Sequence, residues 1–140
     1  MASEPSPARP PRTTGLRHVA LFVSSLEETE RFYVELLGMA VEWRPDADNV
    51  YLSSGVDNLA LHRAPAARSE GFQRLDHIGF IMACPEDVDR WYEFLAGHDV
   101  AISAPPRPQR DGARSFYCRD PDGTVVQMIY HPPLAAPATG

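Results

Sequence analysis

Hydrophobic and polar positions follow the same order twice along the chain. Residues 16–23 and 75–82 both consist of Leu, a charged residue, His, a β-branched residue, a small residue and then apolar residues. The two segments are 59 residues apart, and further similar pairs align at this offset, including Tyr33 with Tyr92. Agreement at so many positions indicates that the chain contains two copies of one supersecondary unit.

Each copy is predicted to fold as a strand, a helix and three further strands. Residues 16–23 are almost continuously apolar, which is typical of a strand buried on both faces. The helix that follows is expected to begin at a capping box formed by Ser25 and Glu28 and to end at Gly38. The other predicted elements are strands at 40–43, 50–53, 59–62, 75–82, 100–103, 115–118 and 124–130, a helix from Pro85 to Gly97, and proline-containing loops at 44–49 and 104–112.

The repeat also sets the domain organisation. One domain is expected over residues 15–131, consisting of module one (15–63), a polar linker (64–73) and module two (74–131). Half of the 14 prolines lie in the leader, 1–14, and in the tail, 132–140. Both ends are predicted to be disordered, because they offer too little apolar surface to offset chain entropy.

Composition narrows the possible partners and the compartment. A formal net charge of −6 argues against nucleic acid as a partner, since phosphate binding needs clustered Lys and Arg. No apolar run is long enough to span a bilayer, and residues 1–14 lack the apolar core of a secretory signal. Cys84 and Cys118 make a poor disulfide framework, so a reduced, cytoplasmic location is expected.

Two histidines, His18 and His77, occupy equivalent positions in the two predicted first strands. Equivalent inward-facing positions of a pseudo-twofold pair can converge near the axis, so the two imidazoles are candidates for half of a metal site. Gln127, on the final strand, is the best candidate for a further inward-facing group. The matching place in the first copy falls on either His62 or Ala60, which would share one face of their strand.

Several of these features together resemble the vicinal oxygen chelate superfamily. They are the paired βαβββ units, the L-x-H strand starts, the Phe-Tyr-x-x-Leu-Leu-Gly helix end at residues 32–38 and the Asp-Pro-Asp-Gly turn at residues 120–123. This superfamily includes glyoxalase I, methylmalonyl-CoA epimerase, fosfomycin-resistance thiol transferases, extradiol dioxygenases and bleomycin-binding resistance proteins. The resemblance implies an α+β fold in which two tandem βαβββ modules form a curved mixed β-sheet around a cavity, with the helices on the outside.

The resemblance also implies a divalent metal ion (Fe, Mn, Ni, Co or Zn) and its ligands. The first-strand ligands fall on His18 and His77, and the last-strand ligand, usually Glu, falls on Gln127. A glutamine carbonyl brings no negative charge, so this set would leave the charge of the metal uncompensated. If His62 rather than Ala60 takes the fourth place, three histidines and Gln127 would suit a first-row transition metal. Gln is a poor proton acceptor, so no general base is identified.

Two functions of different class follow from the resemblance. The first is a glyoxalase-like lyase, isomerase or dioxygenase in which the metal activates a small oxygen-rich substrate as a Lewis acid. The second is a metal-free protein, like the drug-sequestering members, whose cavity binds an aromatic or amphipathic molecule. Superfamily members often dimerise, so a homodimer is expected. The residues predicted to bind the substrate or ligand are Trp43, Tyr51, Phe116, Tyr117 and Arg114.

Overall fold

The chain folds as two βαβββ modules. The computed structural model describes residues 9–12, 14–67, 69 and 71–134. The first module contains β1 (His18–Val23), α1 (Leu26–Arg31), the π-helical segment η1 (Phe32–Leu36), β2 (Ala40–Asp46), β3 (Asn49–Ser53) and β4 (Asn58–Arg63). The second contains β5 (Ile78–Ile81), α2 (Pro85–Gly97), β6 (Ile102–Pro108), β7 (Arg114–Arg119) and β8 (Val125–Tyr130), and is followed by the 3-10 turn η2 (Pro132–Leu134).

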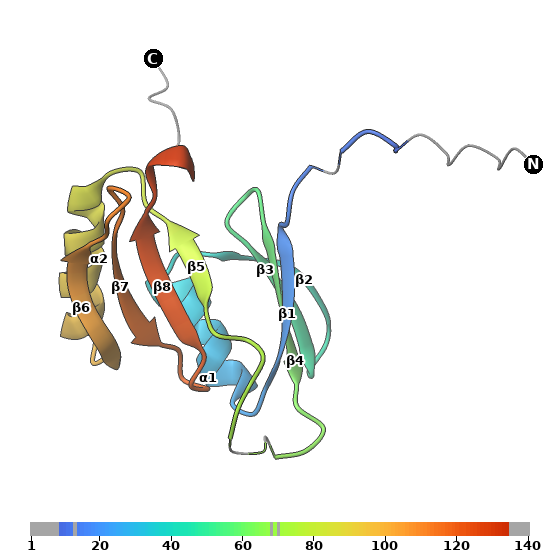
Figure 1. Cartoon of the computed structure of the whole chain (residues 1–140). Coiled ribbons are helices and arrows are strands. Elements are labelled where there is room, and N and C mark those ends of the chain that lie inside the picture. The colour runs from blue at the N-terminus through green and yellow to red at the C-terminus, as the bar shows by residue number, and fades with distance from the viewer. Residues whose placement is uncertain (1–8, 13, 68, 70, 135–140) are drawn as a thin grey trace, which may run out of the picture.

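Each module builds one four-stranded mixed sheet. The strand order is β1-β4-β3-β2 in the first sheet and β5-β8-β7-β6 in the second. β1 pairs with β4, and β5 with β8, in parallel, whereas the other pairs are antiparallel. Figure 1 shows the inner-edge strands β1 and β5 facing each other, with α2 on the far side of the second sheet. The predicted α+β fold of two tandem βαβββ modules around a cavity is confirmed, and the curved sheet is divided into two halves.

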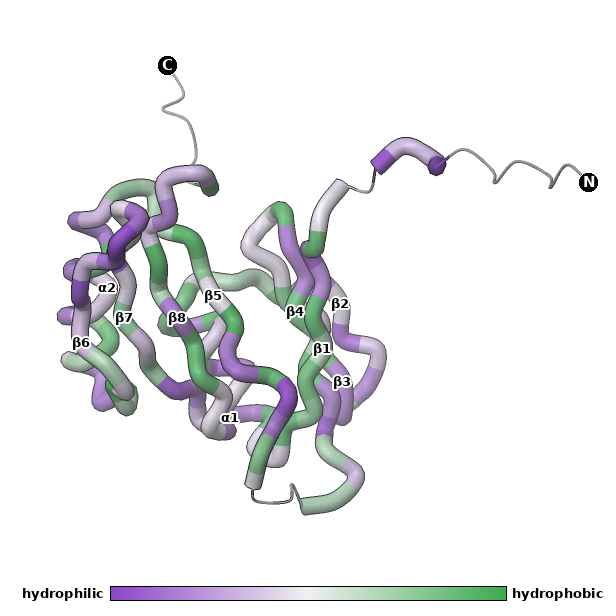
Figure 2. Tube along the Cα trace, viewed as in Figure 1, coloured by the Kyte–Doolittle hydropathy of each residue, from purple (hydrophilic) through white to green (hydrophobic). Residues whose placement is uncertain are grey.

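Each sheet has one face covered by helices and one open face. Hydrophobic stretches run along β4, β5 and β8, while hydrophilic residues gather on the outer side of α2 and β6 (Figure 2). On β1, Val23 is fully buried, whereas His18, Ala20 and Phe22 are exposed. The prediction that this strand is buried on both faces was therefore wrong, because no second layer of the described chain covers its open face.

Prolines lie inside the two outer-edge strands. The predicted loops at 44–49 and 104–112 were too long, since β2 includes Pro45 and β6 includes Pro105, Pro106 and Pro108. Proline has no amide hydrogen, and an edge strand has one side on which no partner strand needs that hydrogen. The register of both edge pairs is also irregular, which is compatible with missing ladder hydrogen bonds.

The modules are joined by contacts between η1, the start of α1 and the β7–β8 turn. The predicted capping box does not form: no side chain caps α1, and the backbone amides of Ser24 and Ser25 donate instead to Oδ1 of Asp122, at 2.8 and 3.0 Å. Tyr33 from η1 stacks on Phe80 from β5, with ring centroids 6.1 Å apart. Buried residues of both modules form one continuous hydrophobic core.

The predictions for the chain ends fall mostly outside the described residues. Residues 1–8, 13 and 135–140 are not among the described residues. Disorder of the leader and tail, and the module boundaries proposed from the repeat, remain predictions. No helix among the described residues is long and apolar enough to cross a membrane.

Candidate functional site between the two sheets

The strand register defines which positions of the two modules are equivalent. Ala20 of β1 lies opposite Ala60 of β4, and Gly79 of β5 lies opposite Gln127 of β8. Ala20 and Gly79 occupy the same place in the sequence repeat. The position equivalent to Gln127 in the first module is therefore Ala60, and His62 lies two residues further along the same face of β4.

His18 lies on the open face of the first sheet, at the start of the inner-edge strand β1. Its Nδ1 is 2.7 Å from Oδ1 of Asn58, the residue opposite it on β4. Nδ2 of Asn58 in turn donates to Oε2 of Glu42 on β2, at 2.9 Å. Because an amide oxygen only accepts, Nδ1 carries a hydrogen and donates to it, and Nε2 is the nitrogen not used in this contact.

His77 has the same arrangement immediately before β5. Its Nδ1 is 2.6 Å from Oδ2 of Asp76. Its ring meets the ring of Tyr117 edge to face, with centroids 5.4 Å apart and planes at 88°. A carboxylate that accepts from Nδ1 orients the ring, and this is the usual outer contact of a metal-binding histidine.

Gln127 lies at the centre of a hydrogen-bonded group on the open face of the second sheet. Its Nε2 donates to Oγ of Ser115, at 3.1 Å, and to the hydroxyl of Tyr117, at 3.0 Å. Its Oε1 lies 3.8 Å from the place that a Cβ at Gly79 would occupy, above the inner-edge strand β5. Both amide hydrogens are thus used within the sheet, and no donor of the described residues reaches the carbonyl oxygen.

An aromatic strip crosses the open face of the first sheet and takes one ring from each strand. Trp43 of β2 stacks on Tyr51 of β3, with centroids 5.2 Å apart. Tyr51 meets His62 of β4 edge to face, and His62 contacts Phe22 of β1. Trp43 is 58% exposed and Phe22 is 68% exposed, so this strip presents apolar surface to the space in front of the sheet.

Two residues predicted to bind the substrate lie on the other face of β7. Phe116 is fully buried in the core and packs against Tyr92 of α2. Arg114 forms two hydrogen bonds, at 2.9 and 2.8 Å, with the carboxylate of Asp89 on α2. These two assignments require correction, because alternate residues of a strand point to opposite faces: of the three predicted residues on β7, Tyr117 shares the open face with Gln127, whereas Phe116 and Arg114 do not.

A groove runs beside the inner edges of the sheets. It has a volume of about 950 Å³ and is lined by residues of β1, the linker and the β7–β8 turn, including Ala20, Phe22, Asp76 and Val125. Ala20 and Phe22 are open-face neighbours of His18, and Asp76 holds His77. The groove therefore reaches the surroundings of both histidines.

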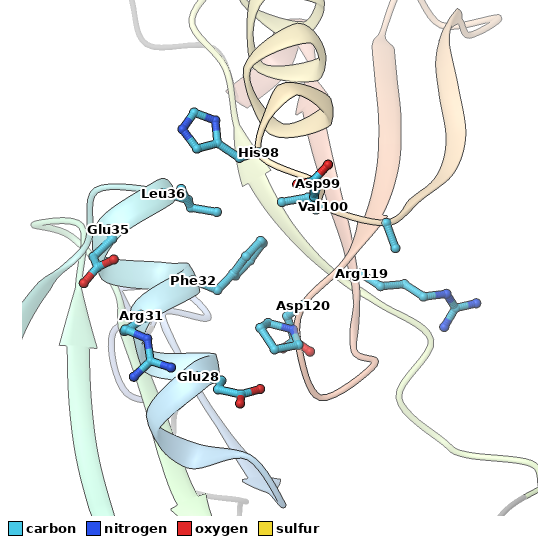
Figure 3. Close-up of a pocket in the computed structure, with 12 residues that line it drawn as sticks. Glu28, Arg31, Phe32, Glu35, Leu36, His98, Asp99, Val100, Arg119 and Asp120 are labelled. Atoms are coloured by element: carbon cyan, nitrogen blue, oxygen red, sulfur yellow. The ribbon is translucent and has the colours of Figure 1, made fainter.

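A second cleft, of about 530 Å³, lies on the helix side (Figure 3). Phe32 and Leu36 of η1 face Val100, and charged residues including Arg31 and Asp99 surround this apolar floor. None of the residues predicted to bind metal or substrate lines this cleft.

The three predicted ligands are of the nitrogen and oxygen types that a divalent transition-metal ion accepts. They are two imidazoles, each hydrogen-bonded at Nδ1, and one amide carbonyl, a combination suited to first-row transition metals. Within the described part of the chain, no three His, Cys, Asp or Glu side chains form a possible metal site. The resemblance assigned the third ligand to Gln127, whose Oε1 is the end of the amide that does not donate to Ser115 or Tyr117.

Duplicated βαβββ modules, each with its first strand parallel to its last, define the class of fold to which this chain belongs. The sequence of residues 15–128 matches the model of the family described as Glyoxalase/Bleomycin resistance protein/Dioxygenase superfamily. The chain therefore belongs to the superfamily that the sequence features resembled.

Solved structures of similar proteins support the fold. Lactoylglutathione lyase from Agrobacterium tumefaciens matches with a TM-score of 0.73 and 20% identity, over 89% of this chain and 98% of that chain. A glyoxalase-related enzyme from Fulvimarina pelagi matches with a TM-score of 0.72 and 19% identity, over 91% and 96%. Integron cassette protein HFX_CASS4, from the mobile metagenome of a Halifax Harbour sewage outfall, matches with a TM-score of 0.70 and 25% identity, over 85% and 100%.

Sequence reasoning missed the residues that orient the histidines and Gln127. Asp76 could have been found, since it is adjacent to His77 in sequence. Asn58 and Ser115 could not, because their roles depend on strand register: Asn58 lies opposite His18, and Ser115 lies two residues from the partner of Gln127.

Proposed function

We propose that the chain is a divalent-metal-dependent, glyoxalase-like enzyme of the lyase, isomerase or dioxygenase type, acting on a small oxygen-rich substrate. His18, His77 and Gln127 would hold the ion through Nε2, Nε2 and Oε1. Such an ion would act as a Lewis acid on a substrate oxygen. His62 is left out of this set, because the register gives the fourth equivalent position to Ala60.

The observation that carries the proposal is the matched hydrogen bonding of His18 and His77 at Nδ1. Each is held at Nδ1 by an oxygen, from Asn58 at 2.7 Å and from Asp76 at 2.6 Å. In both rings Nδ1 donates to this oxygen, so Nε2 is the ring nitrogen that remains for a metal ion.

Metal analysis of the untagged protein tests the proposal. The wild-type protein is expected to bind about one equivalent of Fe, Mn, Ni, Co or Zn, and a His18→Ala/His77→Ala variant is expected to lose it. His98→Ala is a matched control, because His98 is also held at Nδ1, by the carbonyl oxygen of Phe94, but lies away from the sheets. Absence of binding by the folded wild-type protein, after incubation with each ion, would refute the proposal.

The aromatic strip favours a second candidate function, a metal-free binding protein of the bleomycin-resistance type. Trp43, Tyr51, His62 and Phe22 offer stacking surface for a flat or amphipathic molecule without any metal. Titration of aromatic ligands against wild type and Trp43→Ala distinguishes the two functions. Binding that depends on Trp43, and persists in the His18→Ala/His77→Ala variant, would support the binding protein.

The remaining expectations concern assembly and compartment. A homodimer is proposed because members of the superfamily often dimerise, and a monomer detected by light scattering would contradict it. A cytoplasmic location is proposed because Cys84 and Cys118 are both free thiols in the described chain. Small molecules are the proposed partners, and neither nucleic acid nor a membrane is expected.

A further inference from the structure

We propose that Ser115 and Tyr117 are positioning residues that determine which end of the Gln127 amide faces the space between the sheets. This inference rests on the proposed function, since it concerns how the proposed third ligand is presented. We refer to the two hydroxyl-bearing residues as the hydroxyl pair. They lie on alternate positions of β7, on the same face as Gln127.

The hydroxyl pair uses both hydrogens of the Gln127 amide. Nε2 of Gln127 donates at 3.1 Å to Oγ of Ser115 and at 3.0 Å to the hydroxyl of Tyr117. Ser115 is only 1% exposed, and its Oγ also accepts from Nε2 of Gln109, at 3.2 Å. A buried hydroxyl with two donors directed at it holds its position, because leaving either donor unpaired costs free energy.

The hydroxyl pair thereby leaves the carbonyl oxygen as the vacant end of the amide. Oε1 points over Gly79, where the absence of a side chain leaves room above β5. A Cβ at this position would stand 3.8 Å from Oε1, and a larger side chain would cover it. Amide orientation and a small neighbour together present one neutral acceptor atom at the inner edge of the second sheet.

Tyr117 acts on both proposed ligands of the second module. Its hydroxyl accepts a hydrogen bond from Gln127, and its ring makes an edge-to-face contact with the ring of His77, at a centroid distance of 5.4 Å. Replacement by Phe removes the hydroxyl and keeps the ring. The variant Tyr117→Phe therefore separates the effect on the amide from the effect on the histidine.

The first module supplies a built-in comparison. Tyr51 is opposite Ala60 on β4, as Tyr117 is opposite Gln127 on β8. Both modules therefore have a tyrosine at this position, but only the second has an amide for it to hold. Tyr51→Phe is the matched control: it removes a hydroxyl at the equivalent place with no expected effect on Gln127.

The test is the ¹H–¹⁵N spectrum of the side-chain amides of the full chain, recorded without metal. Gln127→Glu identifies the Gln127 pair of signals by their loss. Tyr117→Phe and Ser115→Ala are each expected to move one signal of this pair towards the position of a solvent-exposed amide and to speed its exchange. Tyr51→Phe is expected to leave both signals in place, and far-ultraviolet circular dichroism checks that each variant is folded.

Two results would overturn the inference. One is a wild-type Gln127 pair that already exchanges like a solvent-exposed amide. The other is that Tyr117→Phe leaves both Gln127 amide signals in place. This second result can be obtained even if Ser115→Ala fails to fold. If loss of a tyrosine hydroxyl acted only by loosening the fold, Tyr51→Phe would move the Gln127 signals as Tyr117→Phe does.

A second measurement connects the hydroxyl pair to the proposed function. If Gln127 is a ligand, Tyr117→Phe should weaken Co²⁺ binding by about 10- to 100-fold, the usual effect of removing an outer contact of a metal ligand. Failure of the wild-type protein to bind Co²⁺ would overturn the proposed function while the amide spectrum still decides the orientation of Gln127. Unchanged Co²⁺ affinity in Tyr117→Phe would remove Gln127 from the ligand set.

Discussion

The hydroxyl of Tyr33 donates a hydrogen bond of 2.8 Å to Oδ2 of Asp120, and both residues are buried. Tyr33 belongs to η1 of the first module, and Asp120 lies in the β7–β8 turn of the second. Oδ1 of the same carboxylate accepts from the backbone amides of Asp122 and Thr124, each at 2.9 Å. One buried carboxylate thus shapes the turn and fastens it to the other module.

Loss of the Tyr33 hydroxyl should destabilise the domain. Tyr33→Phe keeps the stack on Phe80 but removes one donor from a carboxylate that is only 4% exposed. Removing one partner of a buried charged group costs on the order of 1–3 kcal/mol. Equilibrium unfolding in urea measures the change. Tyr51→Phe serves as the control, and equal stabilities of the two variants would show that the hydrogen bond contributes nothing.

Titration of Asp120 should make the stability of the domain depend on pH. Burial raises the pKa of Asp120, against the opposing effect of the hydrogen bond from Tyr33. A carboxyl whose folded-state pKa exceeds its unfolded-state pKa favours folding at low pH. This contribution is lost as the pH rises from about 4 through the folded-state pKa.

Asp120→Asn isolates this effect, because an amide has nearly the same shape and does not titrate. Relative to the variant, the wild-type protein should lose unfolding free energy as the pH rises above about 4. Unfolding of both proteins at a series of pH values checks the sign. A difference between them that stays constant or grows with pH would contradict the raised pKa. Glu27 and Asp89 contribute a pH dependence of the opposite sign, because hydrogen bonds with Arg63 and Arg114 lower their pKa values. These contributions are the same in both proteins and cancel when the two unfolding free energies are subtracted.

Arg114→Ala should have a small effect on stability and none on ligand binding. The guanidinium binds Asp89 of α2, so it joins β7 to the helix and lies away from the open face of the sheet. A partly exposed ion pair of this kind contributes about 1 kcal/mol or less. Unfolding and Co²⁺ titration measure the two quantities side by side. A large loss of Co²⁺ or ligand affinity would restore the role in substrate binding that the sequence suggested.

Phe116→Ala should be strongly destabilising. The ring is fully buried between the second sheet and α2, where it contacts Tyr92. Truncation leaves a cavity in the core, which costs about 3–5 kcal/mol for a phenylalanine. Thermal or urea unfolding measures the loss. If the stability were nearly unchanged while aromatic ligands bound less tightly, the original assignment of Phe116 to the cavity wall would be right.

The fold was predictable because the sequence pattern of the module occurs twice in the chain. A single L-x-H strand would have carried little information, but the second copy fixed the order of elements in both modules. Predictions that relied on one position failed more often. Pro105 and Pro106 suggested a loop, although an edge strand accepts them, and Ser25 suggested a cap, although Asp122 from the other module occupies that place.

The candidate site was predictable only in part, for a geometric reason. His18 and His77 could be paired from the repeat, but sequence offset does not fix strand register, so Ala60 and His62 could not be separated. Adjacent residues such as Phe116 and Tyr117 cannot share a face of a strand, and alternation alone could have divided them. Contacts across strands, such as Ser115 with Gln127, appear only when the register is known.

The prolines of β2 and β6 have a consequence for assembly. Pro45, Pro105, Pro106 and Pro108 leave gaps in the row of amide donors along the outer edges, so an extended chain docking there would miss several hydrogen bonds. The inner-edge strands β1 and β5 contain no proline. Outward growth by strand addition, the first step of fibril formation, is therefore disfavoured at both outer edges. The inner edges, beside His18 and His77, have no such gaps.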